Sequence, residues 1–338
     1  MPIEAGPVRL LLPAAPYDAT VQAMVLSAPN DLSLRDVEEP VAGSGEVIVE
    51  VAACGVCRTD LQIVSGDIEM RKRPVIPGHQ VVGRIVGTGE RVGLAWLAGA
   101  CGRCRQCLAA RENLCELADF RGWTVDGGYA ERVAARRDFA FALPDGMSDI
   151  EAAPLLCAGI IGYRSLRLSG VEPGGRLGLF GFGSSAHLAI QVARHWGCDV
   201  FVFSRSPAEH DLARELGAVW VGGYDDPPPE PLDAAVTFAP AGSVVVSALA
   251  AVGPAGIVAI NAIHLDGIPA FSYDLLWRER VLRSVANFTR DDAREFLALA
   301  AEIPIRAQTQ TFALAEAPQA LARLAAGEVQ GSAVLTVG

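Results

Sequence analysis

Four cysteines in one short segment, CGRCRQCLAARENLC, are the residues best placed for metal chemistry in this sequence. Cys101, Cys104 and Cys107 are each separated by two residues, and Cys115 closes the segment. Thiolates at this spacing can bind one ion from both sides, and four of them complete the tetrahedron of structural Zn²⁺ sites. Free surface thiols or an iron–sulfur site are the alternatives. We interpret the segment as a closed zinc site that maintains its lobe and performs no chemistry.

Three further candidate ligands lie far apart in the chain: Cys57 in CGVCRTD, His79 in PGHQVVG and Cys157 in LLCAGIIGY. A single cysteine is usually an inert apolar residue, so each is weak evidence alone. Sulfur and imidazole nevertheless suit zinc. Two cysteines and one histidine also leave a fourth position for water or substrate, which is the arrangement of catalytic zinc.

A glycine-rich turn occurs in RLGLFGFGSSAHLAIQVAR, where Gly181 and Gly183 follow an expected strand and Ala186 takes the third position of G-x-G-x-x-A. The first glycine permits a tight turn, the second lets the backbone approach a pyrophosphate, and the small third residue lets helix and strand pack closely. The N-terminus of the next helix then faces the phosphates. This pattern predicts a dinucleotide site.

The end of the following strand, VFVFSRS, concerns the choice of dinucleotide. Enzymes that use NAD usually carry Asp or Glu there to bind the ribose 2′-hydroxyl. Here Ser204, Arg205 and Ser206 follow the strand, with no carboxylate. Arg205 can pair with a 2′-phosphate in bidentate fashion, whereas an Arg205 pointing to solvent is the alternative. We therefore predict that NADP(H), bound with help from Ser204 and Arg205, is favoured over NAD(H).

Length and charge restrict the class of protein. The 338 residues allow two domains, and the net charge of −11 argues against a nucleic-acid partner. No apolar run reaches the ~20 residues that span a bilayer. Residues 1–21 are interpreted as a Pro/Ala-rich N-terminal extension rather than a signal peptide. We expect a cytoplasmic protein with no membrane partner, in which reduced cysteines favour metal binding or catalysis over disulfides.

The pattern of elements changes near residue 150. Residues 22–149 contain short β-branched or alternating segments separated by Gly and Pro, which predicts an all-β domain with a loop-rich insertion near 97–125. Residues 150–286 alternate strands with helices, which predicts βαβ units and a parallel sheet. Two helices and a last strand within 287–338 are expected to return to the β domain.

Five motifs occur in one order: CGVCRTD, GHQ, the four-cysteine segment, LCAG and the glycine-rich turn. In this order they resemble the zinc-containing medium-chain alcohol dehydrogenases of the yeast and cinnamyl types. The resemblance implies an α/β protein with a GroES-like all-β catalytic domain (22–149 and 287–338) and a Rossmann cofactor domain with a doubly wound parallel sheet (150–286). It also implies two Zn²⁺ per chain, and a homodimer or homotetramer.

The resemblance assigns roles to residues near the first motif. It makes Cys57, His79 and Cys157 the catalytic zinc ligands, and Asp60 the acid that orients the ligand histidine. Thr59 would bond the substrate alcohol and start the proton relay. Arg58 would contact the cofactor pyrophosphate. The alternatives are a solvated loop carboxylate for Asp60, a turn-capping threonine and a free surface arginine. Cys54 and Cys198 are interpreted as structural.

Three residues depart from the family pattern. Gln62 replaces a histidine that completes the proton relay in many members, and an amide cannot act as a general base near neutral pH. Gln80 replaces the glutamate that usually follows the ligand histidine. Ile161 replaces a threonine, which makes the nicotinamide face more apolar. These changes affect the expected rate and substrate range rather than the reaction class.

Several other residues are candidates for a functional or a structural role. Trp96 resembles a pocket-lining tryptophan but equally suits a core position. Residues 287–292, NFTRDD, resemble the segment whose backbone meets the nicotinamide carboxamide. Four histidines match no motif and are interpreted as structural or surface residues: His187, His195, His210 and His264.

Together these patterns predict an enzyme that transfers hydride between a nicotinamide cofactor and a small alcohol or aldehyde. One alternative is a zinc-free quinone or enoyl reductase of the same superfamily, which would lack the metal ligands. The other is a weakly active or non-enzymatic relative, an interpretation that Gln62 and Gln80 keep open. The identity of the alcohol or aldehyde is not determined by the sequence.

Overall fold

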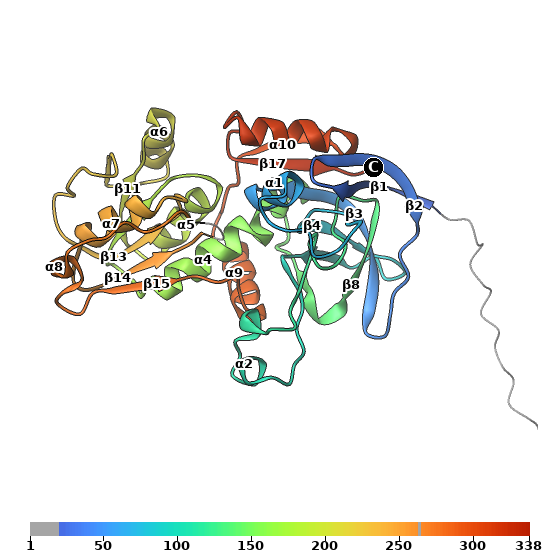
Figure 1. Cartoon of the computed structure of the whole chain (residues 1–338), viewed down its shortest axis with the longest axis horizontal. Coiled ribbons are helices and arrows are strands. Elements are labelled where there is room, and N and C mark those ends of the chain that lie inside the picture. The colour runs from blue at the N-terminus through green and yellow to red at the C-terminus, as the bar shows by residue number, and fades with distance from the viewer. Residues whose placement is uncertain (1–19, 263–264) are drawn as a thin grey trace, which may run out of the picture.

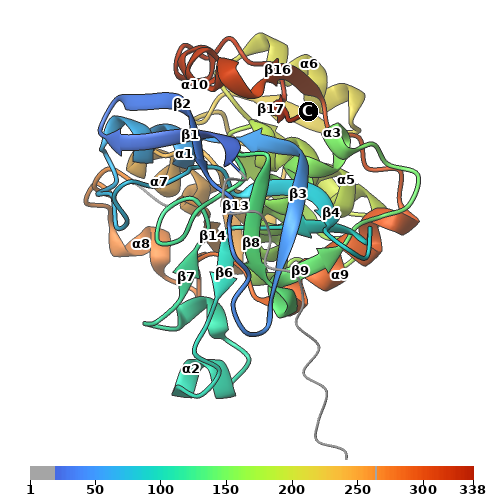
Figure 2. The same cartoon turned by 90° about the vertical axis from the view of Figure 1, so that its right-hand side faces the viewer.

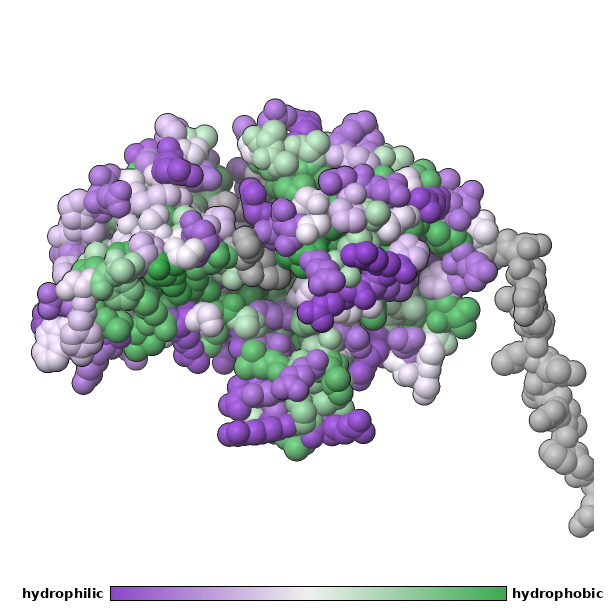
Figure 3. All heavy atoms as spheres, in the orientation of Figure 1, coloured by the Kyte–Doolittle hydropathy of each residue, from purple (hydrophilic) through white to green (hydrophobic). Residues whose placement is uncertain are grey.

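The computed structural model describes residues 20–262 and 265–338. The N-terminal extension expected over 1–21 therefore lies almost entirely outside the described residues, and His264 lies outside them as well. The molecule has two parts, each built on its own sheet (Figure 1). In the space-filling view a notch separates the two parts on the upper side of the molecule (Figure 3).

The first part contains a six-stranded sheet in the order β12-β11-β10-β13-β14-β15, with every pairing parallel. Numbered from β10, this order is 3-2-1-4-5-6, the order of a doubly wound dinucleotide-binding sheet. Its central strands are apolar runs buried on both faces, as parallel strands covered by helices must be. The strands are β10 (Arg176–Phe180), β11 (Asp199–Phe203), β12 (Trp220–Gly222), β13 (Leu232–Thr237), β14 (Val252–Ile260) and β15 (Val281–Ser284).

Helices accompany these strands in the expected alternation (Figure 1). They are α4 (Ala158–Ser169), α5 (Ser184–His195), α6 (Pro207–Glu215), α7 (Gly242–Ala251) and α8 (Tyr273–Leu276). Helix α4 was not predicted, because Gly159 and Gly162 lower the helix propensity of its sequence. Both glycines serve packing: a Cβ at Gly162 would lie 3.1 Å from the carbonyl oxygen of Ser185 on α5, and one at Gly159 would clash with Phe296.

The second part is organised around a seven-stranded sheet in the order β16-β17-β3-β4-β5-β9, with β8 also paired to β3. The C-terminal strand β17 pairs antiparallel with β3, so the end of the chain returns to this sheet. The strands are β3 (Glu46–Val56), β4 (Gln80–Ile85), β5 (Arg91–Leu94), β8 (Arg132–Arg136), β9 (Ala140–Ala142), β16 (Thr309–Ala313) and β17 (Ser332–Thr336). Two small antiparallel pairs accompany it: β1 (Thr20–Ala28) with β2 (Asp31–Glu38), and β6 (Leu97–Gly99) with β7 (Asp119–Phe120).

Some strand predictions in this part were wrong in detail. The sequence of residues 90–99, ERVGLAWLAG, predicts one strand, but the structure has two, β5 and β6, which belong to different sheets. Strand β2 was missed because its sequence, DLSLRDVE, exposes residues on both faces and has no buried alternation to detect. The short strand β16 was also missed.

The remaining helices lie beside the second sheet or where the two parts meet, except α2, which lies at the end of a projecting lobe (Figure 2). They are α1 (Arg58–Ser65), α2 (Arg105–Leu108), α3 (Asp149–Ala152), α9 (Arg290–Glu302) and α10 (Ala317–Ala325), with 3₁₀ turns at Glu112–Leu114, Arg137–Phe139, Ala153–Leu156 and Leu314–Glu316. Helix α9 is joined to α4 by the buried Asp292, whose carboxylate accepts hydrogen bonds from Arg164 and Arg167. Within the described ranges, no helix is long and apolar enough to cross a membrane.

Candidate active site and metal centres

The CRTD segment forms the start of helix α1. The Sγ atom of Cys57 accepts a hydrogen bond from the backbone N–H of Thr59 at 3.3 Å, and the Asp60 carboxylate accepts one from the N–H of Cys57 at 2.9 Å. This reciprocal pair is a capping box, so the spacing of Cys57 and Asp60 has a local structural reason. The sulfur consequently lies at a helix N-terminus, where a thiolate is stabilised.

His79 immediately precedes β4 and is held from behind by Asp60. Its Nδ1 lies 3.0 Å from Asp60 Oδ1, and its Nε2 lies 3.3 Å from Cys57 Sγ. Asp60 is fully buried, so the alternative of a solvated loop carboxylate is wrong. Gly78 has φ +96°, and a Cβ there would clash with the ring of Tyr129, so only glycine lets the chain place His79 here.

Cys157 brings the third donor to the same place from the turn before α4. The ligand atoms of Cys57, His79 and Cys157 lie within 4.8 Å of one another, which lets them hold one metal ion. Over residues 20–262 and 265–338, this group contains no fourth cysteine, histidine or carboxylate. The fold therefore assembles the open two-cysteine, one-histidine set that catalytic zinc requires.

The pKa shifts differ among the three donors of this group. A hydrogen bond from Cys157 lowers the pKa of the Cys57 thiol well below its ordinary value, with a further contribution from His79 that acts against burial. The same hydrogen bond, together with burial, raises the pKa of Cys157. Burial disfavours a charged His79, but the charges of Asp60 and Cys57 outweigh it and raise the pKa of the imidazole. Cys57 is thus the donor that is most readily a thiolate, whereas Cys157 and His79 would have to release protons to bind a metal ion.

An aromatic cluster adjoins His79. The ring of Trp96 meets the imidazole edge to face at 5.0 Å and stacks against Phe120 at 5.4 Å and Trp123 at 5.8 Å. Phe120 and Trp123 were not singled out from the sequence, because nothing in their local pattern separates them from core residues. Trp96 is mostly buried, which suits both a core and a pocket-lining position.

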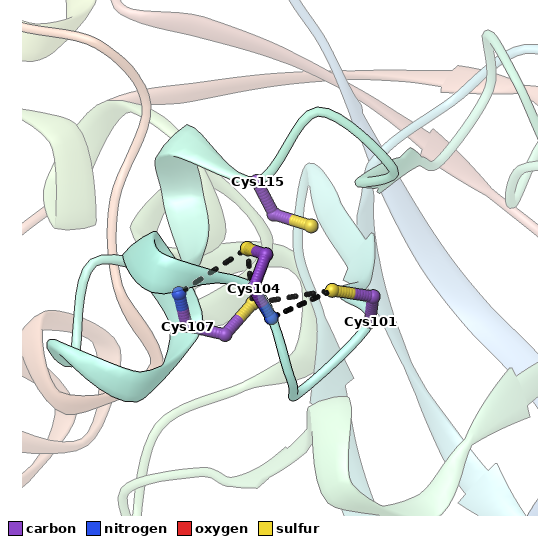
Figure 4. A group of neighbouring side chains, drawn as sticks. All are labelled: Cys101, Cys104, Cys107 and Cys115. Atoms are coloured by element: carbon purple, nitrogen blue, oxygen red, sulfur yellow. Dashed lines mark hydrogen bonds between the residues drawn. The ribbon is translucent and has the colours of Figure 1, made fainter.

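The four-cysteine segment forms a lobe around α2 that projects from the rest of the molecule (Figure 1). The sulfurs of Cys101, Cys104, Cys107 and Cys115 point toward one another (Figure 4) and lie within 4.8 Å of each other. Backbone N–H groups of Arg103 and Cys104 lower the pKa of Cys101 to about 6, which favours its thiolate. All eight cysteines of the chain are free thiols.

The turn inside this lobe contacts the segment that begins α9. Asn113 Nδ2 donates to the carbonyl oxygen of Ala286 at 2.7 Å. The backbone N–H of Arg290 donates to Glu112 Oε1 at 2.9 Å. Burial raises the pKa of the Glu112 carboxyl, but hydrogen bonds, above all the one from Arg290, outweigh burial and lower it. These residues were not identified from the sequence, because their partners lie far away along the chain.

The dinucleotide turn has the predicted geometry. Gly181 has φ +92° and follows β10, and a Cβ on it would lie 2.8 Å from the backbone nitrogen of Ala239. At Gly183 a Cβ would meet no described atom within 4 Å, so its backbone faces open space that a pyrophosphate can approach. Ala186 lies in the first turn of α5 and is fully buried. Ser184 at the start of α5 shares a 2.7 Å hydrogen bond with Ser332 of β17.

Ser204 and Arg205, which follow β11, have different surroundings. Ser204 is buried and donates its hydroxyl hydrogen to Glu209 of α6, while it accepts from the N–H of Ser206 at 3.1 Å. Arg205 is exposed, and its guanidinium lies 5.9 Å from the ring centroid of Tyr224. Arg205 is therefore free to meet an anion, whereas the Ser204 hydroxyl already has protein partners.

The other predicted residues occupy varied positions. Arg58 is exposed at the start of α1, and the Gln62 side-chain oxygen is buried without a partner in the described part of the chain. Cys54 and Cys198 are fully buried outside both cysteine groups, and Gln80 is buried beside Gly55.

The three described histidines that match no motif, His187, His195 and His210, lie on helices. His187 is buried on α5, and burial lowers its pKa to about 4. His195 ends α5, and His210 Nε2 lies 2.9 Å from the carbonyl oxygen of Ser204.

Comparison with known proteins agrees with this architecture. Residues 43–145 match the family described as alcohol dehydrogenase GroES-like domain, and residues 185–302 match the family described as zinc-binding dehydrogenase. A probable alcohol dehydrogenase, AdhA, of Mycobacterium tuberculosis is 44% identical over 94% of this chain and 98% of its own length. An alcohol dehydrogenase of Geobacillus stearothermophilus is 33% identical over 93% of this chain and 98% of its own.

Among solved structures, a cinnamyl alcohol dehydrogenase of Sorghum bicolor superposes with a TM-score of 0.86 at 25% identity, over 94% of this chain and 98% of that one. The fold and site therefore define an α/β oxidoreductase with a GroES-like part and a Rossmann-type part. Within that class, the chain belongs to the zinc-type medium-chain alcohol dehydrogenases. The zinc-free reductase alternative is not favoured.

Proposed function

We propose that this alcohol dehydrogenase binds two zinc ions per chain and uses one of them to transfer hydride between a small alcohol or aldehyde and a nicotinamide dinucleotide. The observation that carries the proposal is the convergence of Cys57, His79 and Cys157 within 4.8 Å, with a buried carboxylate behind the imidazole. Three donors leave one position open for a substrate oxygen. The four cysteines of the lobe fill all positions around the second ion.

The donor set fits zinc and predicts a role for each neighbouring residue. Bound zinc would supply a Lewis acid that lowers the pKa of a coordinated alcohol. Asp60 holds His79 in the tautomer that presents Nε2 to the metal. Thr59 accepts the proton of the alcohol and passes it toward solvent. Gln62 can relay it only through hydrogen bonds, because its amide does not titrate.

The cofactor site fits a dinucleotide, since the Gly183 backbone faces open space at the start of α5. We propose that Arg205 binds a 2′-phosphate, so that NADP(H) is preferred over NAD(H), and that Arg58 meets the pyrophosphate. Glu209 opposes this preference electrostatically, because its carboxylate is held at the same strand end by Ser204.

This balance is measurable with single substitutions. We expect Arg205→Ala to lower kcat/KM with NADP(H) by about tenfold or more while NAD(H) changes little, since a charge-assisted contact is worth about 1.5–3 kcal/mol. Glu209→Gln is the matched control and should shift preference further toward NADP(H). A wild-type enzyme that strongly prefers NAD(H) would contradict the assignment of Arg205.

We also propose that the chain forms a homodimer or homotetramer. Strand β15 is an unpaired edge of the parallel sheet, and large apolar side chains are exposed near it at Tyr273, Trp277 and Val281. Edge strands and exposed apolar surface both favour association. Light scattering after size-exclusion chromatography tests this proposal, and a monomer at micromolar concentration would refute it.

The decisive test of the main proposal combines metal analysis with an activity panel. The purified protein should contain two zinc ions per chain. Primary and secondary, aliphatic and aromatic alcohols and aldehydes are then assayed with both dinucleotides by the absorbance change of the nicotinamide. A protein with one zinc ion or none, or with no cofactor-dependent turnover of any member, would refute the proposal.

A further inference from the structure

A row of aromatic rings leads away from His79, one of the three donors of the proposed catalytic metal site. Trp96 meets the imidazole edge to face at 5.0 Å, and Trp123 stacks on Trp96 with ring centroids 5.8 Å apart and an interplanar angle of 16°. The guanidinium carbon of Arg71 lies over the Trp123 ring, 5.2 Å from its centroid. The row thus begins at a metal donor and ends at a cation.

The exposure of these side chains increases along the row. Trp96 is mostly buried, Trp123 is half-buried, and Arg71 is exposed. Phe120 is also half-buried and stacks on Trp96 at 5.4 Å with an interplanar angle of 28°. Rings that are nearly parallel and partly open to solvent form a flat apolar surface. A flat apolar or aromatic molecule is stabilised by lying against such a surface.

The segment that carries Arg71 is joined to the turn that carries Trp123. The indole Nε1 of Trp123 donates to the carbonyl oxygen of Glu69 at 2.8 Å, two residues before Arg71. Asp126, three residues after Trp123, pairs with Lys72. These two contacts lie on either side of Arg71 in the sequence, so they hold its backbone beside the aromatic row.

The charge of Arg71 is available to a ligand. Arg71, Lys72 and Arg73 form the longest run of consecutive cationic residues in the chain. Asp126 pairs with Lys72, whereas no carboxylate of residues 20–262 and 265–338 lies within ion-pair distance of Arg71 or Arg73. A guanidinium that stacks on an aromatic face still presents its N–H groups at its edge, where they can bind a carboxylate through two parallel hydrogen bonds.

We propose that Arg71 binds a carboxylate at the far end of the substrate, while the flat apolar body of the substrate lies against Trp96, Phe120 and Trp123. This inference rests on the proposed alcohol dehydrogenase activity and adds a substrate class to it: alcohols and aldehydes with a flat apolar body and a terminal carboxylate. Arg71 determines specificity and takes no part in proton or hydride transfer.

Matched pairs of substrates test the proposal. The aldehydes are 4-carboxybenzaldehyde and the longer 4-carboxycinnamaldehyde, each compared with the carboxamide that replaces its carboxylate by an uncharged group of similar shape. We expect the wild type to favour the acid of at least one pair by about two- to fivefold in kcat/KM, the range of an exposed ion pair. The difference should lie mainly in KM, because a contact far from the reacting atoms changes little in the transition state.

Substitutions at two neighbouring arginines separate a specific contact from general attraction. Arg71→Gln should bring the ratio of acid to amide close to one, and Arg71→Lys should retain part of it. Arg73→Gln is the matched control, because Arg73 is also exposed and unpaired in the described part of the chain but lies over no aromatic ring there. Its ratio should equal that of the wild type. About 0.5 M salt should weaken the preference of the wild type, since salt screens exposed charges.

The outcomes distinguish this inference from the proposed function. Equal ratios in the wild type and Arg71→Gln, or an equal fall in Arg73→Gln, would overturn the role of Arg71. Turnover of the amides with no preference for either acid would also overturn it and would leave the alcohol dehydrogenase activity intact. A wild type that reduces none of these aldehydes with either dinucleotide, nor any other member of the activity panel, would instead refute the proposed function itself.

Discussion

The two cysteine groups of this protein use the same kind of ligand in opposite ways. In the lobe, four thiols come from a single segment, 101–115, and surround one point from all sides (Figure 4). In the other group, Cys57, His79 and Cys157 come from three separate elements and lie against a buried carboxylate. The lobe can be recognised locally, whereas the second group exists only because β3, β4 and α4 meet.

On the proposed function, the difference separates a structural metal site from a catalytic one. A closed set of four thiolates leaves no room for substrate, so its ion can only stabilise the polypeptide. An open set of three donors leaves a fourth position at which the ion can bind substrate. Because these donors come from separate elements, the rest of the fold must hold them in place. Asp60, the capping box of α1 and the packing of Tyr129 on Gly78 supply that support. The following substitutions test this contrast.

The largest effect is expected at the open group, which consists of Cys57, His79 and Cys157. Cys57→Ala, His79→Ala or Cys157→Ala should reduce turnover to background, because each removes a ligand of the ion that activates the alcohol. Far-ultraviolet circular dichroism should remain like wild type, and metal analysis should show one zinc ion per chain. Cys198→Ala, which changes a buried cysteine outside both groups, is the control and should retain activity. Normal activity in any of the three ligand variants would end the proposed mechanism.

A large effect on stability rather than on turnover is expected at the closed group, the four cysteines of the lobe. Cys104→Ser should lower Tm by roughly 5–10 °C, corresponding to about 2–3 kcal/mol, because the lobe loses the ion that organises it. The kcat of the enzyme that remains folded should stay within about threefold of wild type. Thermal unfolding and initial rates measured on the same preparation separate the two outcomes. Unchanged Tm with lost activity would reverse the roles assigned to the two groups.

An intermediate effect is expected for Asp60, which binds His79 of the open group. Asp60→Asn keeps the shape of the side chain but removes the charge that orients His79, so activity or metal affinity should fall by about 10–100-fold. Zinc affinity measured by competition with a chelator gives a readout apart from rate. If both quantities stay at the wild-type level, the carboxylate is a capping group for α1 and nothing more.

The smallest effect concerns His187, a buried histidine that has no carboxylate partner in the part of the chain that the structure describes. Burial lowers its pKa to about 4 from an ordinary value near 6.5, so the folded state keeps it neutral. The free energy of unfolding therefore keeps its full value above pH ~6.5. It falls as the pH decreases from there toward 4, by up to about 1.4 kcal/mol per pH unit, because only the unfolded chain takes up the proton. His187→Gln should show a shallower loss of unfolding free energy over this range, measured by urea titration. An identical pH dependence would contradict the burial argument.

Much of the architecture could be predicted from local patterns. The glycine-rich turn, the alternation of strands with helices and the four-cysteine segment each depend on residues close together in sequence, and the structure has the parallel sheet and the lobe where those patterns lie. Helix α4 was missed because its glycines weaken the local helical signal while serving contacts with α5 and Phe296. Strand β2 was missed because neither of its faces is buried.

The sequence by itself determined which side chains can bind a metal ion and which of them lie close together in one segment. Spacing over a few residues follows directly from backbone geometry. Only the tertiary structure decided that the Ser204 hydroxyl is engaged by Glu209 and that Trp96 lies against His79. These facts depend on contacts between residues far apart in the chain. Such contacts are set by the packing of whole elements, and no local pattern encodes that packing.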